Sequence, residues 1–329
     1  MKPITSLALL SALSVAANAA VTDPVGYVTE SIVSGFNFVG LTVHEATVVA
    51  GDLEVVTSST VTDSDVDFDS TLTSGVTYLL EIDGGLGITE VITSWTGNVL
   101  TTETDLSGVV SAGATYSIRP AATLESVFGA AGENIAEGTF GTAGAEQVWL
   151  FNGSGYDKYY YDTTSPDGFS ATWRQIEPVT QNLADPSSVV LPYAEGFILF
   201  AAAARDLVLT GEVKMDATEI NVVSGFNFAA SSTPVSGTLA TAFGVDGSAL
   251  TAGTFGTAGA DQVWLFNGSG YDKYYYDTTS PDGFSATWRQ IEPVTQNIAD
   301  PSAVAIPSGY IIFSAAAGDI TQGIPVYAP

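Results

Sequence analysis

The sequence predicts an all-β protein made of two tandem β-sandwich-like or barrel-like domains that arose from an internal duplication. Residues 139–182 recur as residues 254–297 with one difference, Glu146 against Asp261. A second string, residues 32–38, returns as residues 222–228, so the duplication covers nearly the whole chain. Aromatic and β-branched runs alternate with Gly-rich turns, which is typical of short strands.

Each aromatic block is expected to contain a β-hairpin. Residues 147–151 and 156–162 form two aromatic runs, and an Asn-Gly-Ser-Gly turn at residues 152–155 joins them. Strand alternation places Tyr156, Lys158 and Tyr160 on one face of the second strand. A loop at residues 163–168 leads to a third strand at residues 169–176.

The chain begins with the features of a secretory signal peptide at residues 1–19. Lys2 supplies the positive charge, residues 4–15 form a short apolar run, and residues 17–19 fit a cleavage site. The apolar run is too short to cross a bilayer, and no later stretch is long and apolar enough to be a transmembrane segment. We therefore expect a secreted protein in the periplasm, on the outer surface or outside the cell.

The two copies differ by an insertion. The offsets of 115 and 190 residues place 75 additional residues in the first copy, between Phe38 and Thr123. We predict a first β-domain at residues 20–213, with an inserted β-subdomain at about residues 45–120, and a second β-domain at residues 214–329. Strand patterns at residues 76–82, 88–95, 99–104 and 115–119 predict a small barrel or sandwich in the insertion.

Each copy also carries a predicted short helix before its aromatic block and an apolar strand after it. The helices are expected at residues 123–129 and 238–244, where a Thr suits the N-cap and a Gly suits the C-terminus. The apolar runs at residues 196–204 and 309–317 predict strands that are covered on both faces.

Composition limits the classes of partner. The chain has 36 acidic and 8 basic residues, and its net charge of −28 disfavours nucleic acid and anionic lipid as partners. It contains no cysteine, so its stability must come from hydrophobic cores without disulfide bonds.

An alternating acidic run is the best candidate for a metal site. On a strand, Asp63, Asp65, Asp67 and Asp69 would share one face, and carboxylate oxygens are ligands that Ca²⁺ prefers. The run does not match an EF-hand loop, and a solvated strand face is the simpler interpretation. Calcium is therefore the one cofactor that the sequence suggests.

A second metal candidate is the repeated loop that begins at Asp162 and ends at residues 167–168, with its twin from Asp277 to residues 282–283. Turn chemistry alone explains Asp and Gly at these positions. We therefore favour an ordinary turn in both copies.

The tyrosine-rich hairpins are the candidate ligand-binding surface, because flat aromatic rings stack on sugar rings. The predicted binding residues are those of the open face in both copies: Tyr156, Lys158, Tyr160, Tyr271, Lys273 and Tyr275. Two copies would form a bivalent site. The alternative is a core role for the aromatic residues of the block, namely Trp149, Phe151, Tyr159, Tyr161 and Trp173.

The sequence predicts no enzyme. The only histidine, His44, is not accompanied by a G-x-S-x-G motif, and phosphate-loop and dinucleotide motifs do not occur. A hydrolase based on two carboxylates is the third hypothesis, but any pair is uninformative in a chain with so many acids.

The chain resembles a family of secreted proteins from Verrucomicrobia and related bacteria for which no activity is known. The resemblance rests on residues 23–28, 78–82, 116–120, 123–129 and 147–151, and on the Trp173-Arg174 pair. In that family the pattern usually occurs once per chain, so the second copy is a departure. The resemblance implies export and a β-rich fold, and it implies no activity and no catalytic residues.

The expected function is that of an exported structural or adhesive protein of the cell surface or extracellular matrix, without catalysis. The alternative is a carbohydrate-binding protein that uses the repeated tyrosine-rich hairpins. The expected partners are other copies of the chain, joined through sheet edges, or an extracellular polysaccharide.

Overall fold

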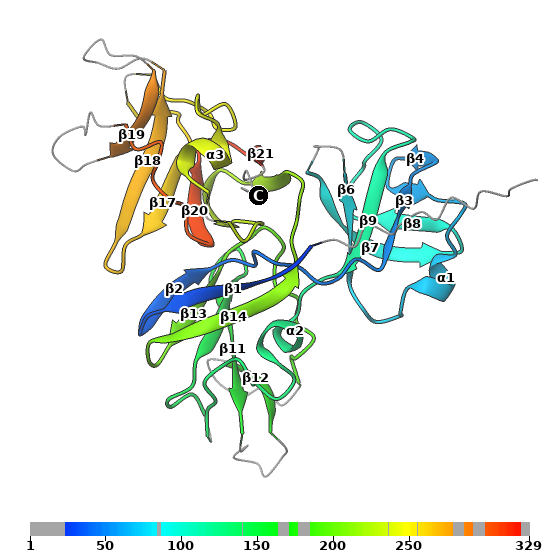
Figure 1. The fold of residues 1–329 in the computed structure, drawn as a ribbon, viewed down its shortest axis with the longest axis horizontal. Coiled ribbons are helices and arrows are strands. Elements are labelled where there is room, and N and C mark those ends of the chain that lie inside the picture. Colours follow the sequence, from blue (N-terminus) through cyan, green and yellow to red (C-terminus); the bar gives the residue numbers. More distant parts are fainter. Residues whose placement is uncertain are drawn as a thin grey trace, which may run out of the picture.

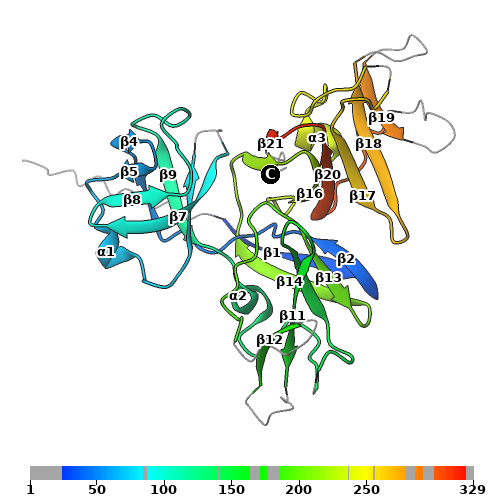
Figure 2. The same ribbon diagram turned by 180° about the vertical axis from the view of Figure 1, so that it is seen from behind.

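The computed structural model describes residues 24–83, 87–139, 141–163, 171–176, 185–235, 237–254, 256–278, 286–291 and 300–323. Within these residues the chain forms 21 strands and three short helices, which confirms the all-β class. Figures 1 and 2 show three bodies: two repeats and the unit inserted into the first. The predicted signal peptide lies outside the described residues.

Repeat 1 consists of two antiparallel sheets that share one core. The smaller sheet pairs β1 (Val25–Ile32) with β14 (Arg205–Glu212). The larger sheet has the order β12-β11-β10-β13-β2, formed by β2 (Gly35–Val39), β10 (Gln147–Phe151), β11 (Tyr156–Asp162), β12 (Thr172–Ile176) and β13 (Phe197–Ala201). Side chains from both sheets and from helix α2 (Leu124–Phe128) form one buried cluster, as in a sandwich.

Repeat 2 reproduces this arrangement. Strand β15 (Thr218–Val222) pairs with β21 (Gly318–Gln322). The larger sheet has the order β16-β20-β17-β18-β19, formed by β16 (Gly225–Ala230), β17 (Gln262–Phe266), β18 (Tyr271–Asp277), β19 (Thr287–Ile291) and β20 (Gly309–Ser314). Helix α3 (Leu239–Phe243) contributes to its separate core.

The insertion forms a seven-stranded antiparallel sheet with its own core. Its order is β3-β9-β6-β7-β8-β5-β4, from β3 (Val49–Asp52), β4 (Val55–Thr57), β5 (Thr60–Thr62), β6 (Tyr78–Ile82), β7 (Thr89–Thr96), β8 (Val99–Thr102) and β9 (Thr115–Pro120). Helix α1 (Phe68–Thr71) places Phe68 in this core. Strands β3 to β5 have only three or four residues each, which is why no alternating pattern predicted them.

Local sequence signals account for the hairpins and helix caps. Strands β10 and β11 pair as predicted, with Val148 opposite Tyr159, and Gly153 in their connecting loop has a φ of 87° that favours glycine. Helix α2 begins after Thr123, whose side chain accepts a hydrogen bond from the Ser126 backbone N–H at 3.1 Å.

The string shared by residues 32–38 and 222–228 forms a pinned turn between two strands. The Asn37 side chain accepts from the Val33 N–H and donates to the Val33 carbonyl, each at 2.8 Å. Asn227 makes the same two bonds to Val223 in repeat 2. These bonds explain why an asparagine recurs at this position in both copies.

The single difference between the aromatic blocks has a structural counterpart. Glu146 is buried and forms an ion pair of 2.6 Å with Arg205 of β14. Asp261, the shorter residue in repeat 2, instead accepts hydrogen bonds of 2.8 Å from the Ser314 hydroxyl and the Ala315 N–H. In repeat 2, Gly318 occupies the strand position that Arg205 has in repeat 1. Both the acidic residue and its partner therefore differ between the repeats.

The repeats pack on each other with approximate twofold symmetry. Phe38 stacks on its counterpart Phe228 with ring centroids 5.6 Å apart and planes inclined by 10°. The backbones also approach closely: a Cβ on Gly309 would lie 2.6 Å from the Val39 nitrogen, and a Cβ on Gly196 would lie 2.8 Å from the carbonyl oxygen at position 229. Equivalent residues therefore meet across the interface, as in an isologous dimer.

Candidate binding surfaces

The predicted tyrosine sites are only partly accessible. Tyr160 and Tyr275 are fully buried, and their hydroxyls donate to Asp162 and Asp277 at 3.2 and 3.1 Å. Burial and the adjacent carboxylate raise the pKa of both phenols to about 12. The prediction that these two tyrosines lie on an open face is therefore wrong. In repeat 1, the loop around Gly138 covers the Tyr160 ring. A Cβ on Gly138 would lie only 3.2 Å from an atom of that ring.

The other two predicted tyrosines belong to a continuous network of aromatic rings that crosses both repeats, and the two predicted lysines lie over its indole rings. Its central pair is Phe38 and Phe228. Phe38 contacts Phe266 and Tyr271 at centroid distances of 5.3 and 5.8 Å. Phe228 makes the equivalent contacts to residues 151 and 156 at 5.4 and 6.0 Å. Tyr156 and Tyr271 thus help to join the repeats.

The outer end of the network in repeat 1 is half exposed, and we call it patch 1. Its rings are Phe36, Trp149 and Phe200, with centroids 5.1 to 6.0 Å apart. Lys158 places its Nζ 3.7 Å from the centre of the Trp149 ring, in a cation–π contact. The Trp149 indole N–H donates to Gln147 Oε1 at 3.0 Å. Phe36 is 44% exposed, so patch 1 presents a ring surface to solvent.

Repeat 2 carries the same arrangement, which we call patch 2. Phe226, Trp264 and Phe313 lie 5.0 to 5.9 Å apart, and Lys273 Nζ is again 3.7 Å from the indole centre. Trp264 donates to Gln262 Oε1 at 3.0 Å. Phe226 is 52% exposed. The protein therefore presents two copies of one aromatic surface.

Trp149 and Phe151 are not core residues, contrary to the alternative drawn from the sequence. They alternate with buried Val148 and Leu150 along β10 and point to the outer side of the sheet. Trp173, by contrast, is fully buried, as expected. The Phe-Asn-Phe pattern at residues 36–38 was the available signal for the patch, because it places two rings on one strand face.

The acidic run at residues 63–69 does not form a strand. Strand β5 ends at Thr62, and α1 begins at Phe68. Asp63 is buried and accepts hydrogen bonds from the Tyr116 hydroxyl at 2.7 Å and the Asp65 N–H at 2.9 Å, while Asp69 accepts from the N–H of residue 97. The shared strand face predicted for Asp63, Asp65, Asp67 and Asp69 is therefore wrong.

A different acidic group gathers there instead. One oxygen from each of Glu54, Asp63 and Asp65 lies within 4.8 Å of the others. Glu54 also accepts bonds from the N–H and hydroxyl of Ser64 at 2.7 and 2.6 Å. Hydrogen bonds within the protein thus explain why these three carboxylates lie close together. Calcium binding stays a prediction.

The second predicted metal loop is described only at its first two residues in each copy. Asp162 and Asp277 are buried, and each accepts a bond of 3.1 Å from a backbone N–H, of Gly141 and Gly256 respectively. The acidic and glycine residues at 167–168 and 282–283 lie outside the described residues.

A buried ionic network joins the insertion to both repeats. Glu81 of the insertion forms ion pairs with Arg119 at 2.8 Å and with Lys214 at 3.3 Å. The Tyr193 hydroxyl donates to Glu81 at 2.6 Å and accepts from Lys214 at 2.8 Å. Burial acts to raise the pKa of Glu81, but the charges of Lys214 and Arg119 outweigh it and lower that pKa to about 2.

His44 completes this junction. Its Nε2 donates to the carbonyl of Ser232 in repeat 2 at 2.9 Å, and its ring lies 5.2 Å from that of Tyr193. Burial lowers the pKa of His44 to about 4. The imidazole is therefore neutral at pH 7 and serves as a link between the bodies.

Acidification is expected to destabilise the protein through His44. The pKa is about 4 in the folded chain and about 6.5 when unfolded, so the unfolded state binds more protons between these values. The unfolding free energy should fall as the pH drops through that window, by about 3 kcal/mol in total. Urea unfolding at pH 7 and pH 5 should show about 2 kcal/mol of this fall. His44→Gln should show a smaller fall, and an equal fall would contradict the assignment.

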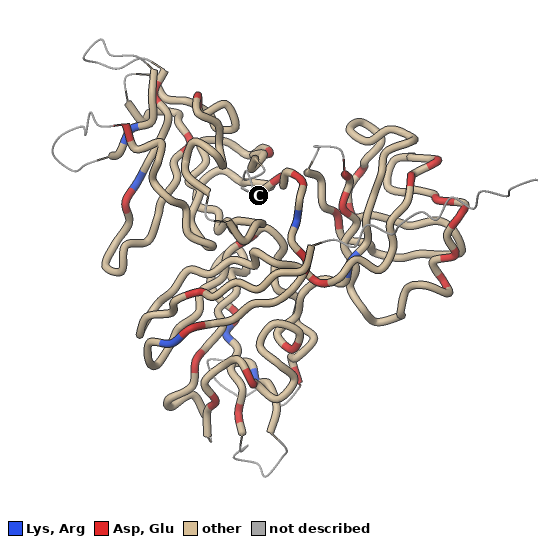
Figure 3. Tube along the Cα trace, viewed as in Figure 1, with Lys and Arg blue, Asp and Glu red and all other residues tan. Residues whose placement is uncertain are grey.

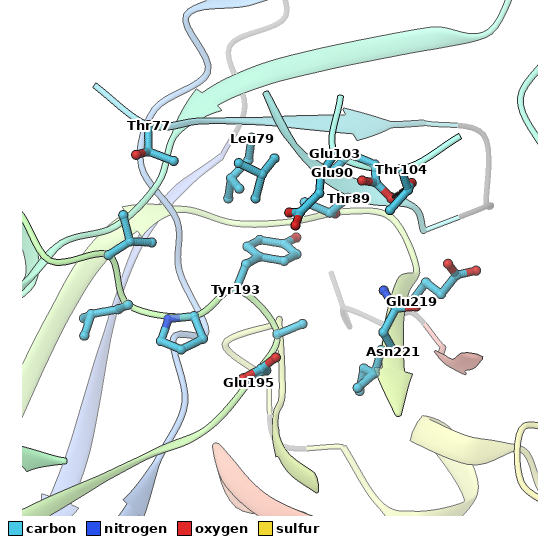
Figure 4. A pocket seen from close by; sticks show the side chains of 16 residues that line it. Thr77, Leu79, Thr89, Glu90, Glu103, Thr104, Tyr193, Glu195, Glu219 and Asn221 are labelled. Atoms are coloured by element: carbon cyan, nitrogen blue, oxygen red, sulfur yellow. Dashed lines mark hydrogen bonds between the residues drawn. The ribbon is translucent and has the colours of Figure 1, made fainter. Parts of the chain in front are cut away.

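A cleft of about 350 Å³ lies beside this junction, between the insertion and the two repeats (Figure 4). Leu79, Leu191 and Ile220 are among its apolar lining residues. Its acidic lining residues are Glu90, Glu103, Glu195 and Glu219. Burial raises the pKa of Glu195, and burial together with Asp319 and Glu90 raises that of Glu219.

Acidic residues are distributed over all three bodies, and basic residues are few (Figure 3). Among the described residues, no helix is long and apolar enough to span a membrane. Comparison of the chain with protein-family models, curated proteins and solved structures gives no match.

Proposed function

We propose that this chain is an exported adhesive protein that binds an uncharged extracellular polysaccharide through patches 1 and 2, without catalysis. The observation that carries the proposal is the recurrence of one half-exposed set of rings, glutamine and lysine on both repeats. Exposed aromatic clusters with polar groups at their edge are typical of recognition surfaces.

The chemistry of each patch suits a sugar polymer. The apolar face of a sugar ring stacks on an aromatic ring, and its hydroxyl groups need polar partners at the edge. Gln147 and Lys158 in patch 1, and Gln262 and Lys273 in patch 2, provide such groups beside the indoles. The net charge of −28 favours an uncharged polymer over an acidic one.

Two equivalent patches on one chain also favour a repetitive ligand. A polysaccharide offers the same unit many times, so binding at one patch raises the effective concentration of units at the other. The loss of both patches should therefore reduce retention more than the loss of either alone.

The double variant Phe36→Ala/Phe226→Ala is expected to lose retention on the polysaccharide that binds the wild type. Each ring contributes about 0.5–1.5 kcal/mol, so the combined loss should be at least about fivefold in apparent affinity. Depletion from solution by microcrystalline cellulose, chitin and starch granules measures it. Tyr27→Ser/Val245→Ser is the matched control, because these residues are 76% and 79% exposed and lie outside both patches.

Three results would contradict the proposal. They are no binding of the wild type to any of the three polymers, unchanged retention of the double variant, and release of reducing ends, which would revive the carboxylate hydrolase. Self-assembly through sheet edges, the other interaction suggested by the sequence, is measured in the same series as sedimentation without polymer.

A further inference from the structure

A groove of about 330 Å³ lies between the two repeats, next to patch 1. Its volume falls within the range of about 300–1,000 Å³ that is usual for ligand sites. One wall comes from β1 and β2 of repeat 1, and the other comes from the β17–β18 hairpin and the segment before β20. The residues that matter for its chemistry are Glu30, Ser31, Phe36, Phe266, Asn267 and Ser308.

The groove is continuous with patch 1. Phe36 lines the groove and also contacts Trp149 and Phe200 edge-on, at 5.3 and 5.1 Å. Phe266, on the opposite wall, contacts the central ring Phe38 at 5.3 Å. A ligand that lies on patch 1 therefore reaches aromatic surface on the other repeat without leaving the ring network.

The polar groups of the groove suit a ligand rich in hydroxyls. Glu30 is a partly buried carboxylate that accepts a hydrogen bond from Ser308, and burial raises its pKa. A carboxylate has more acceptor sites than this one bond uses, so it can accept from further hydroxyl groups. Its charge, added to that of the whole chain, disfavours an acidic ligand.

The groove breaks the symmetry between the repeats. In repeat 2, Ile220 and Asn221 occupy the positions of Glu30 and Ser31, and they line the cleft beside the insertion. Phe151, the counterpart of Phe266, is not among the residues that line that cleft. Phe151 and Phe266 are therefore equivalent residues of the two repeats, but of the two only Phe266 lines the groove between the repeats.

We propose that this groove binds the continuation of a polysaccharide chain that lies on patch 1, so that one uncharged chain contacts both repeats. The inference rests on the proposed function and deepens it. It states that the bound chain runs from patch 1 into the groove, and that the ligand must be long enough to reach both. A short oligosaccharide covers patch 1 alone, whereas a longer one enters the groove and stacks on Phe266.

Calorimetric titration of the full chain with trisaccharides and hexasaccharides of cellulose, chitin and starch tests this proposal. The wild type should bind the hexasaccharide of the retained polymer about two- to tenfold more tightly than the trisaccharide, as one added aromatic contact predicts. Phe266→Ala should abolish this gain, and Phe151→Ala should keep it.

The two variants are closely matched. Both residues follow the same Val-Trp-Leu sequence, and each contacts one tyrosine and one central phenylalanine of the network. Urea unfolding should therefore show a similar loss of stability in both. Glu30→Gln is the second variant, because it keeps the shape of the groove and should weaken hexasaccharide binding without changing trisaccharide binding.

The outcomes separate the two proposals. Equal binding of both oligosaccharides, or equal effects of Phe266→Ala and Phe151→Ala, would overturn the groove while leaving the patches as the binding surface. If the wild type bound no polymer and no oligosaccharide, the proposed function and the groove would both fail. If Phe266→Ala did not fold, an unchanged hexasaccharide affinity of Glu30→Gln would overturn the groove.

Discussion

Glu81→Gln is expected to destabilise the protein by about 3–5 kcal/mol, because it leaves two buried cations without their common anion. Arg119 and Lys214 both pair with Glu81, and the side chains of all three are at most 7% exposed. Glutamine has nearly the same size as glutamate, so the loss of stability reflects the removal of the charge. Urea unfolding at pH 7 measures it, since Glu81 with its pKa of about 2 is fully ionised there.

A second substitution separates charge from packing. Lys214→Met removes one of the two cations, so the double variant Glu81→Gln/Lys214→Met should lose less than the sum of the single losses. Glu54→Gln is the matched control, because that carboxylate is exposed and bonds only to Ser64 among the described residues. A change below about 1 kcal/mol in Glu81→Gln would show that solvent reaches the network.

Trp173→Ala is expected to destabilise repeat 1 by about 3–5 kcal/mol, the range for removing a large aromatic residue from a core. Trp173 is fully buried, packs on Phe128 and Tyr161, and donates its indole N–H to the Gly129 carbonyl at 3.2 Å. Thermal and urea unfolding followed by circular dichroism measure the loss.

The duplication supplies an internal comparison for this prediction. Trp288 is equally buried in repeat 2 and donates to the Gly244 carbonyl at 3.1 Å, so Trp288→Ala should give a similar loss. Trp95 is only partly buried beside Tyr78 in the insertion, and Trp95→Ala should be milder. Equal effects of all three variants would mean that burial does not determine the loss.

Local signals predicted the parts of the fold that local physics determines. The capped helices begin after Thr123 and Thr238, and the hairpins pair as expected from their turn residues. Alternation also separated the two faces of β11, with Tyr159 and Tyr161 in the core and Tyr156 and Lys158 beside Trp149 on the outer side. Strands β3 to β5 were missed because three or four residues of mixed polarity carry no periodic pattern.

The binding surfaces depended on contacts that no local pattern contains. Alternation shows that Trp149 and Phe151 share a face, but only the docking of repeat 2 decides that Phe151 contacts Phe228 while Trp149 stays in patch 1. Tyr160 was assigned to an open face because the loop that covers it lies more than 20 residues earlier in the chain. His44 and Ser232 are 188 residues apart, so their bond was beyond prediction.

The stacking of Phe38 on Phe228 has a consequence for how this protein can evolve. In a dimer of two identical chains, every mutation changes both halves at once. A substitution that is favourable in one half must therefore also be tolerated in the other. Fusion of the halves into one gene removes that constraint. Glu30 can differ from Ile220, and one copy can acquire an additional folded unit, while the stacked pair still holds the halves together.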